Sequence, residues 1–192
     1  MLWAYWGINI MIYFTSDLHL WHNKEFIYKD RGYDNIREMS EDIIKIINDT
    51  VKFDDDLYIL GDLMLNDDKY GYKLLSQIKC SHLHIILGNH CSKSRQQIYQ
   101  TLWNLYEIKY ADYLVYGKWN FMLSHYPMIT GDTNTDNKHT SNRVYSLCGH
   151  VHTKDKFLEM KKGIPAYHVE WDAHGKPVSI EEIIEDIRKF YM

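Results

Sequence analysis

Five short apolar segments of this chain each end in side chains that bind metal ions. The motifs are Asp17-Leu18-His19, Gly61-Asp62, Gly88-Asn89-His90, Ser124-His125 and Gly149-His150-Val151-His152. Two aspartates, one asparagine and several histidines are more oxygen and imidazole ligands than one metal ion normally takes from a protein. If the five segments lie side by side, the motifs predict a two-metal centre of the kind that hydrolyses esters.

Each motif follows a run of residues typical of a buried strand. The runs span residues 10–15, 57–60, 83–87, 120–123 and 145–148. Sheets that are flanked by helices gather their ligands at the carboxyl ends of the strands. The two ligand candidates of the first motif, Asp17 and His19, are two residues apart, so an extended chain points both side chains to one side. The same step separates His150 from His152.

Helical patterns alternate with these strands over the first two thirds of the chain, which is typical of an α/β fold. Apolar residues at three- and four-residue steps predict helices near residues 36–49, 72–78 and 98–105, and Ser179 with Glu182 predicts a capping box for a final helix. Strand-like stretches at 113–116, 119–123, 145–148 and 166–171 indicate a second, mixed sheet. The polar segment 131–142 is expected to be a loop between two ligand-bearing strands.

Length and composition favour one globular domain over residues 1–192, in which residues 1–10 form a possible N-terminal extension. The net charge of −4 comes from 22 basic and 26 acidic residues, without a basic run, and predicts no strong binding to duplex nucleic acid. The apolar start lacks a basic region and reaches Asp17 too soon to span a membrane. Three widely spaced cysteines favour a reducing cytoplasm over a disulfide framework.

The five motifs together resemble the calcineurin-like metallophosphoesterase superfamily. Its pattern runs D-x-H, G-D, G-N-H-D/E, a lone H and G-H-x-H, and this chain supplies all five elements from Met11 onward. The segments FTSDLHLWH and KPVSIEEII are most similar to small bacterial and phage phosphoesterases. The resemblance implies a four-layer sandwich, in which two mixed sheets are flanked by helices and the metal site lies at the carboxyl ends of the strands.

Carried over residue by residue, the resemblance implies two metal ions per chain. Asp17, His19 and His152 would hold one ion, and Asn89, His125 and His150 would hold the other. Asp62 would bridge the two, because a carboxylate is the side chain best suited to join two cations. Metal ions in such pairs lie roughly 3.5–4 Å apart and share a water or hydroxide. Mixed nitrogen and oxygen ligands suit Mn, Fe, Zn, Ni or Co, so the ligands do not fix the metal.

His90 is expected to be the catalytic histidine that stabilises or protonates the leaving oxygen, a role that a pKa near 6.5 suits. Cys91 departs from the family pattern, which has an acidic residue here to orient the imidazole. His22 and Arg143 are candidate substrate-binding residues, although a surface histidine explains His22 equally and a solvated loop explains Arg143 better. Other polar residues are interpreted as structural or as lying in a surface turn. They are Arg31, His82, His84, His168, Asp172 and His174.

The resemblance therefore implies a metal-dependent phosphoric ester hydrolase, phosphodiesterase-like, in which a metal-bridging hydroxide attacks phosphorus in line and His90 assists departure. The substrate is a phosphodiester or phosphomonoester, for example a nucleotide or a nucleic-acid end. One alternative is a catalytically weak or inactive metal-binding scaffold of the same fold. Another is a redox metalloprotein with one histidine-rich site, which leaves Asp62 and Asn89 unexplained.

Overall fold

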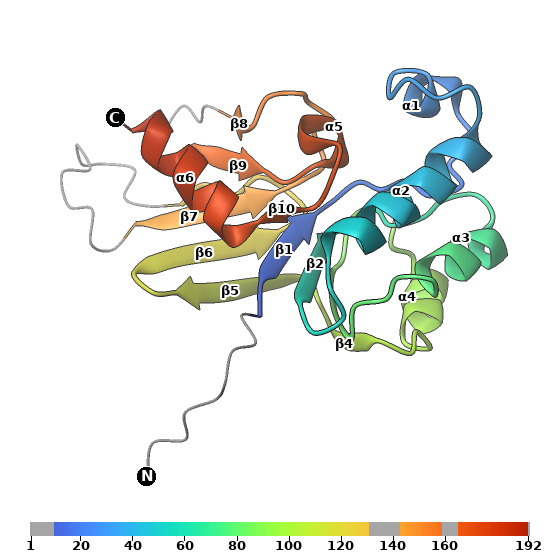
Figure 1. Ribbon diagram of the computed structural model, residues 1–192, viewed down its shortest axis with the longest axis horizontal. Helices are drawn as coiled ribbons and strands as arrows, with labels where there is room; N and C mark the ends of the chain where they lie inside the picture. Colours follow the sequence, from blue (N-terminus) through green and yellow to red (C-terminus); the bar gives the residue numbers. More distant parts are fainter. Residues whose placement is uncertain (1–9, 131–142, 159–164, 192) are drawn as a thin grey trace, which may run out of the picture.

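The computed structural model describes residues 10–130, 143–158 and 165–191 (Figure 1). Of the possible N-terminal extension, only Ile10 belongs to the described residues, and the whole polar segment 131–142 lies outside them. Within the described ranges, no helix has the length and apolar character that crossing a bilayer requires.

The first sheet holds three of the ligand-bearing strands in parallel. Its strands, in spatial order, are β10 (Val178–Ser179), β1 (Ile12–Thr15), β2 (Asp56–Leu60), β3 (His82–Ile86) and β4 (Leu105–Lys109). Strands β1 to β4 are parallel, and only β10 runs antiparallel to its neighbour. The carboxyl ends of β1, β2 and β3 therefore meet at one edge of the sheet.

The second sheet is mixed and holds the other two ligand-bearing strands. Its order is β5 (Ala111–Tyr116), β6 (Trp119–Ser124), β7 (Val144–Cys148), β9 (Ala166–His168) and β8 (Phe157–Leu158). Strands β6, β7 and β9 are parallel, whereas β5 and β8 pair antiparallel at the two edges. The prediction of an α/β fold with two mixed sheets is confirmed.

Helices flank the sheets, and four of them lie at or near the stretches where the sequence predicts a helix. The helices are α1 (Glu25–Tyr28), α2 (Ile36–Thr50), α3 (Asp68–Leu75), α4 (Lys93–Tyr99), α5 (Trp171–His174) and α6 (Ile180–Phe190). In α2, Met39, Ile43 and Ile47 are buried on one face. The predicted capping box of α6 is present: the Ser179 hydroxyl accepts the backbone N–H of Glu182, whose carboxylate accepts the backbone N–H of Ser179.

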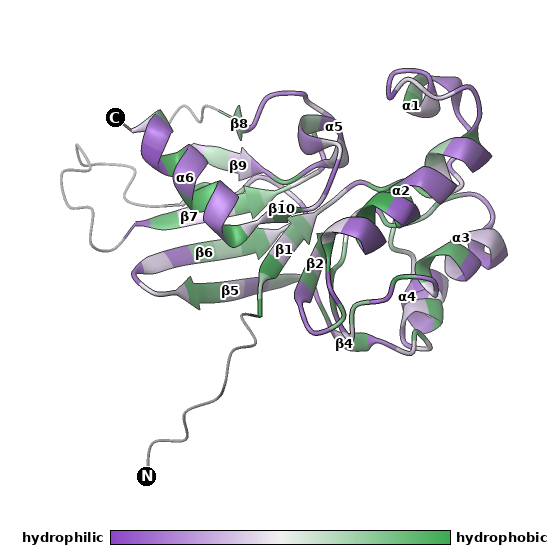
Figure 2. Cartoon of the chain, in the orientation of Figure 1, coloured by the Kyte–Doolittle hydropathy of each residue, from purple (hydrophilic) through white to green (hydrophobic). Residues whose placement is uncertain are grey.

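Two apolar clusters hold the layers together. One lies between the first sheet and helices such as α2 and includes Ile43, Leu57 and Ile85. The other joins the two sheets and α6, and it includes Phe14 and Phe121. Figure 1 shows α2, α3 and α4 on the right, β5 to β7 on the left, and β1 and β2 between them. In Figure 2, hydrophobic residues make up much of the strands, whereas hydrophobic and hydrophilic residues alternate along the helices, as expected for helices with one buried face.

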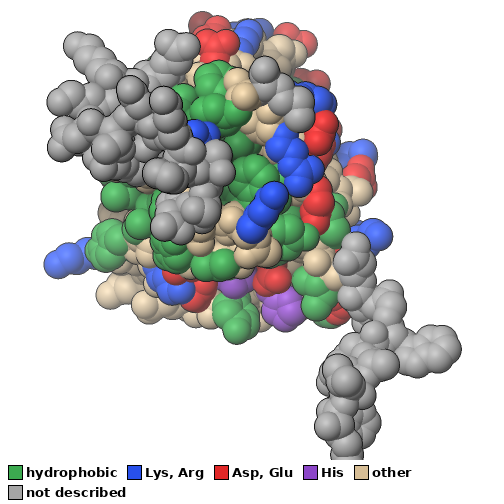
Figure 3. Space-filling model, turned by 90° about the vertical axis from the view of Figure 1, so that its left-hand side faces the viewer, with side chains coloured by type: hydrophobic (Ala, Val, Ile, Leu, Met, Phe, Trp, Pro, Cys, Tyr) green, Lys and Arg blue, Asp and Glu red, His purple; other side chains and the backbone are tan. Residues whose placement is uncertain are grey.

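Figure 3 views the side of the molecule that carries the second sheet. Hydrophobic side chains reach the surface there between acidic and basic ones, without a field of a single sign. Tyr113 and Val115, which alternate along the edge strand β5, are 49% and 59% exposed. The outer face of this edge is therefore partly apolar.

Three predicted elements differ from the structure. Leu105 belongs to strand β4 and not to a helix with Ile98, because α4 ends at Tyr99. The stretch 166–171 is a strand only to His168, after which the chain leaves β9 and enters α5 at Trp171. The helix predicted near residues 72–78 lies earlier, at Asp68–Leu75, with its N-terminus capped by Asp67.

Candidate metal centre

The ends of five strands bring the motif residues together. The loop after β1 runs beside the loop after β2, and the backbone N–H groups of Asp17 and His19 donate to the carbonyls of Gly61 and Asp62 at 3.1 and 3.0 Å. In the second sheet, the Gly149 N–H donates to the His125 carbonyl at 3.0 Å. These backbone bonds set the motif side chains against one another.

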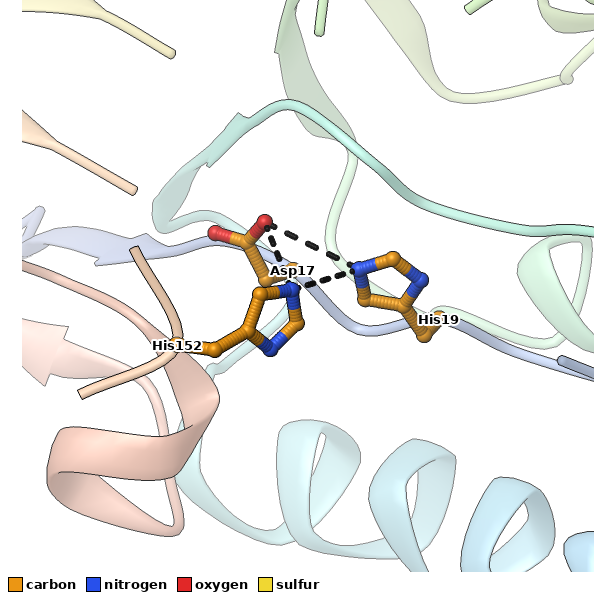
Figure 4. A group of neighbouring side chains, drawn as sticks. All are labelled: Asp17, His19 and His152. Atoms are coloured by element: carbon orange, nitrogen blue, oxygen red, sulfur yellow. Dashed lines mark hydrogen bonds and ion pairs between the residues drawn. The ribbon is translucent and has the colours of Figure 1, made fainter. Parts of the chain in front are cut away.

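Asp17, His19 and His152 form the first cluster (Figure 4). The Nε2 atoms of the two histidines are 3.0 Å apart, and each lies within 3.8 Å of Oδ1 of Asp17. His152 Nδ1 lies 2.9 Å from a carboxylate oxygen of Asp172, so Nδ1 carries the hydrogen and Nε2 offers a lone pair to the cluster. A carboxylate oxygen and two imidazole nitrogens thus converge on one point.

The carboxylate of Asp17 is buried and only half satisfied. Its Oδ2 accepts the His150 backbone N–H at 2.9 Å, while Oδ1 has no hydrogen-bond partner among the described residues. Burial acts to raise the pKa of Asp17, but hydrogen bonds and nearby imidazoles outweigh it and hold the pKa below its usual value. An ionised oxygen that is buried and unpaired fits a cation.

The second cluster contains Asp62, Asn89, His125 and His150. Oδ1 of Asn89 lies 2.7 Å from Nε2 of His125 and 3.0 Å from Nδ1 of His150. Oδ2 of Asp62 lies 3.5 Å from Nε2 of His125. Because Nδ1 of His125 donates to the Leu60 carbonyl at 2.9 Å, Nε2 of this ring also offers a lone pair.

The two clusters adjoin through their carboxylates. One ligand atom each from Asp17, Asp62 and His125 lies within 4.8 Å of the others. Asp62 repeats the arrangement of Asp17: Oδ1 accepts the His90 backbone N–H at 2.9 Å, which leaves Oδ2 to face the imidazoles. The structure therefore brings together all seven residues that the sequence proposes as ligands, and their oxygen and nitrogen atoms could hold metal ions.

Backbone strain is concentrated in the same residues. Seven non-glycine residues of the described chain have a positive φ angle, and five of them are candidate ligands: Asp17 (54°), His19 (49°), Asp62 (49°), His150 (79°) and His152 (55°). Each such conformation costs about 1–3 kcal/mol and persists only where the surrounding structure enforces it, often at functional sites.

The three glycines of the motifs are needed for space. A Cβ atom on Gly61 would lie 2.3 Å from Nδ1 of His125, and one on Gly88 would lie 2.4 Å from Oδ1 of Asp62. A Cβ atom on Gly149 would lie 2.2 Å from Oδ2 of Asp17. A side chain at any of the three positions would push a candidate ligand out of place.

Gly149→Ala is expected to weaken Mn²⁺ binding by at least about tenfold, because the new methyl group displaces the carboxylate of Asp17 and metal affinity depends steeply on ligand placement. Calorimetric titration of the metal-free protein with Mn²⁺ measures this. Gly117→Ala is the control: Gly117 has a φ of 57° and no atom within 4 Å of the added Cβ. It should lose about 1–2 kcal/mol of stability and keep its metal affinity. Equal affinities in the two variants would contradict the tight fit at Gly149.

Sequence reasoning missed the residues that orient His152. Asp172 accepts from Nδ1 of His152 at 2.9 Å and from the Arg31 guanidinium at 2.8 and 2.9 Å. Arg31 also donates to the Asp17 and Leu18 carbonyls. Burial acts to raise the pKa of Asp172, but the bonds from His152 and Arg31 lower it well below its usual value. The bond to Asp172 in turn raises the pKa of His152.

Glu170 holds the turn that carries His150 and His152. Its buried carboxylate accepts the backbone N–H groups of Val151 and Thr153, both at 2.8 Å. Burial and the nearby Asp17 carboxylate raise the pKa of Glu170 to about 7. This support was also invisible in the sequence, because no motif marks a buried glutamate that binds only backbone.

Asp172→Asn should lower metal affinity by about 10- to 100-fold, the usual effect of losing a partner that orients a histidine ligand. Metal titration and the unfolding midpoint should both be measured. Asp186→Asn is a matched control, because Asp186 also accepts two side-chain bonds, from Tyr167 and Lys156, but is not part of the metal centre. Both variants should lose stability, and only Asp172→Asn should lose metal.

His90 projects into the cleft beside the first cluster without joining it. Its Nε2 lies 3.9 Å from Oδ2 of Asp62, and its side chain is 40% exposed. The backbone of His90 is held by two hydrogen bonds: its N–H donates to Asp62, and its carbonyl accepts from the Arg95 guanidinium at 2.8 Å. Cys91 points inward: its buried thiol accepts the Gly88 N–H, and burial raises its pKa. Asp62, and not residue 91, is therefore the carboxylate near His90.

The two candidate substrate-binding residues lie in different places. His22 packs on His19, with Nδ1 atoms 3.1 Å apart, and burial together with neighbouring imidazoles lowers its pKa to about 4. Arg143 precedes β7, whereas the ligands follow the carboxyl end of that strand. At ~3.3 Å per residue, this strand separates Arg143 from the centre by roughly 15–20 Å. Its guanidinium lies over the Tyr191 ring instead.

The chain is similar to two curated proteins along most of its length, and no protein-family model matches it. The gene 66 protein of Mycobacterium phage L5 is 27% identical over 90% of this chain and 92% of the relative. An uncharacterized protein of Methanocaldococcus jannaschii is 29% identical over 93% of this chain and 92% of the relative.

Among solved structures, a protein of unknown function from Aquifex aeolicus has a TM-score of 0.65 at 23% identity, over 92% of this chain and 99% of that chain. The two share a fold. A phosphoesterase from E. coli has a TM-score of 0.45 at 16% identity, over 83% of this chain and 78% of that chain.

Proposed function

We propose that this chain is a dinuclear-metal-dependent phosphoesterase with the four-layer metallophosphoesterase fold, which hydrolyses a phosphodiester or a phosphomonoester. The observation that carries the proposal is the pair of buried carboxylates. In both Asp17 and Asp62, one carboxylate oxygen accepts a backbone N–H and the other oxygen faces imidazole nitrogens. Two buried anions so close together are costly unless cations neutralise them.

In this proposal, Asp17, His19 and His152 would hold one ion, Asn89, His125 and His150 would hold the other, and Asp62 would lie between them as a shared ligand. Divalent ions, when bound, lower the pKa of a coordinated water from about 15.7 towards about 7 and neutralise charge on phosphoryl oxygens. The side chains around them position the substrate. If Nε2 of His19 served as a ligand, Nδ1 of that ring would donate to Nδ1 of His22, and the Nε2–H of His22 would be left to donate to a substrate oxygen.

His90 is placed to protonate the leaving oxygen. It lies in the same cleft as His22 and His19, and its Nε2 is 3.9 Å from the Asp62 carboxylate. After the ester bond breaks, His90 would have given its proton to the departing alkoxide. The ring would then regain a proton from solvent, which balances the proton that the water released when it formed the nucleophile.

The test is an activity screen of the metal-free protein loaded with Mn²⁺, Fe²⁺, Zn²⁺, Ni²⁺ or Co²⁺. Bis(4-nitrophenyl) phosphate and 4-nitrophenyl phosphate report diester and monoester cleavage. We expect turnover that requires added metal and is abolished by a chelator. Two bound ions per chain without turnover of any phosphoester would contradict the proposal and favour a metal-binding scaffold.

A further inference from the structure

A cleft with a volume of about 560 Å³ opens beside the first metal cluster. His19, His22, His90 and His152 line one part of it, and Phe26 and Lys154 are among the residues that line the rest. Small-molecule sites in proteins typically have volumes of about 300–1,000 Å³. The cleft is therefore large enough to hold a group the size of a nucleoside next to the candidate metal centre.

Phe26 is an aromatic side chain left exposed inside this cleft. It is 63% exposed, although its neighbours in α1, Ile27 and Tyr28, are buried. Its ring meets the ring of His22 at 82°, with centroids 6.2 Å apart, so the contact is edge to face. Single exposed aromatics are common on proteins and need no explanation. What makes Phe26 informative is its place in a cleft that four imidazoles of the proposed site also line.

Beside the imidazoles, a lysine and an aspartate of the cleft offer partners for an anionic group and for polar groups of a ligand. Lys154 follows His152 by two residues, is exposed, and forms no ion pair with any other side chain in the described parts of the chain. Asp30, which lines the same cleft, offers an acceptor for a sugar hydroxyl or an amino group. Aromatic platforms with nearby cations are how proteins bind bases of nucleotides without sequence preference.

We propose that this cleft binds the nucleoside part of the substrate, with its base stacked on Phe26 and its phosphate towards the histidines. The inference rests on the proposed function, because it assigns the group that is attached to the reacting phosphorus. It makes Phe26 a specificity-determining residue and makes nucleoside phosphoesters the substrate class.

The test compares two ligands that differ only in the base. These are the phosphonate analogues of adenosine 5′-monophosphate and ribose 5-phosphate, in which a methylene group replaces the ester oxygen so that neither can be hydrolysed. Calorimetry with the Mn²⁺-loaded protein should show the adenosine ligand binding at least about tenfold more tightly, as expected for one base–aromatic stack. Phe26→Leu should reduce this ratio to within about twofold, whereas Lys154→Gln should weaken both ligands alike.

Phe53→Leu is the matched control, because Phe53 is 58% exposed and stacks near Trp103, outside the cleft. It should keep the wild-type ratio. Equal affinities for the two ligands in the wild type, or a ratio unchanged in Phe26→Leu, would overturn the inference. The proposed function is tested separately, because it fails only if the chromogenic esters are not cleaved. If those esters are cleaved but the two phosphonates bind equally, only the nucleoside assignment is refuted.

Discussion

Asp62→Asn is expected to lower kcat/KM for a chromogenic phosphodiester by at least about 10³-fold, because Lewis-acid stabilisation of the transition state is worth several kcal/mol and each factor of ten is about 1.36 kcal/mol. Asparagine keeps the shape of the side chain, so its oxygen can still accept the His90 N–H. Its amide group, however, would place N–H hydrogens where Oδ2 now faces Nε2 of His125. The anionic ligand between the clusters is then lost.

The same substitution should be visible without any substrate. Excess Mn²⁺ at about 100 times its Kd stabilises a protein by about 2.7 kcal/mol. For a chain of this size, this raises Tm by roughly 5–10 °C. We expect the rise to shrink to less than half in Asp62→Asn, while Tm of the metal-free protein does not fall, because a buried charge has been removed.

Asp54→Asn is the control for both measurements, because Asp54 is exposed and lies in the turn before β2. It should change neither turnover nor the shift in Tm. Turnover of Asp62→Asn within about tenfold of the wild type at saturating Mn²⁺ would show that Asp62 does not join the two ions.

The candidate ligands could be predicted because their signal is local. Each motif directly follows an apolar run, and parallel pairing of β1 with β2 and of β2 with β3 sets the ends of those runs at one edge. In the second sheet, the parallel pairing of β6 with β7 likewise sets the residues that follow these strands, His125 and His150, at one edge. Strand type, strand end and ligand type can all be read within a few residues.

The supporting network could not be predicted because its partners are far apart in sequence. Arg31 and Asp172 are separated by 141 positions, and nothing near either residue indicates the other. The error at 166–171 has the same origin. After His168 the chain crosses to the first sheet, where the Trp171 N–H donates to the Ser16 carbonyl and Glu170 bridges Ser16. That crossing ends the strand and brings Asp172 to His152.

The misassigned helix near residue 105 also reflects a distant contact. Ile98, Leu102 and Leu105 have helical spacing, but Asn104 is buried and donates to the carbonyls of Ile78 and Cys80 at 3.2 and 2.8 Å. These bonds fix the turn before β4, so Leu105 begins a strand. Spacing alone could not reveal a side chain that binds the backbone of another loop.

His90→Ala is expected to reduce kcat by about 10²–10⁴-fold for esters with an alkoxide leaving group, which is the usual contribution of a positioned acid. For esters of 4-nitrophenol the loss should be much smaller, because that group departs without a proton. Mn²⁺ affinity should stay within about twofold of the wild type by calorimetry. The backbone N–H of residue 90 still binds Asp62, and the imidazole belongs to neither cluster.

His82→Ala controls for the loss of a half-exposed imidazole, since the side chains of His82 and His90 are 38% and 40% exposed. It should leave kcat unchanged for both kinds of ester. A plot of log kcat against leaving-group pKa separates the possible roles of His90. A steeper slope in His90→Ala than in the wild type means that His90 donates a proton, because poor leaving groups then lose the most. Parallel lines would assign His90 to charge stabilisation, and loss of bound Mn²⁺ in the variant would make it a ligand.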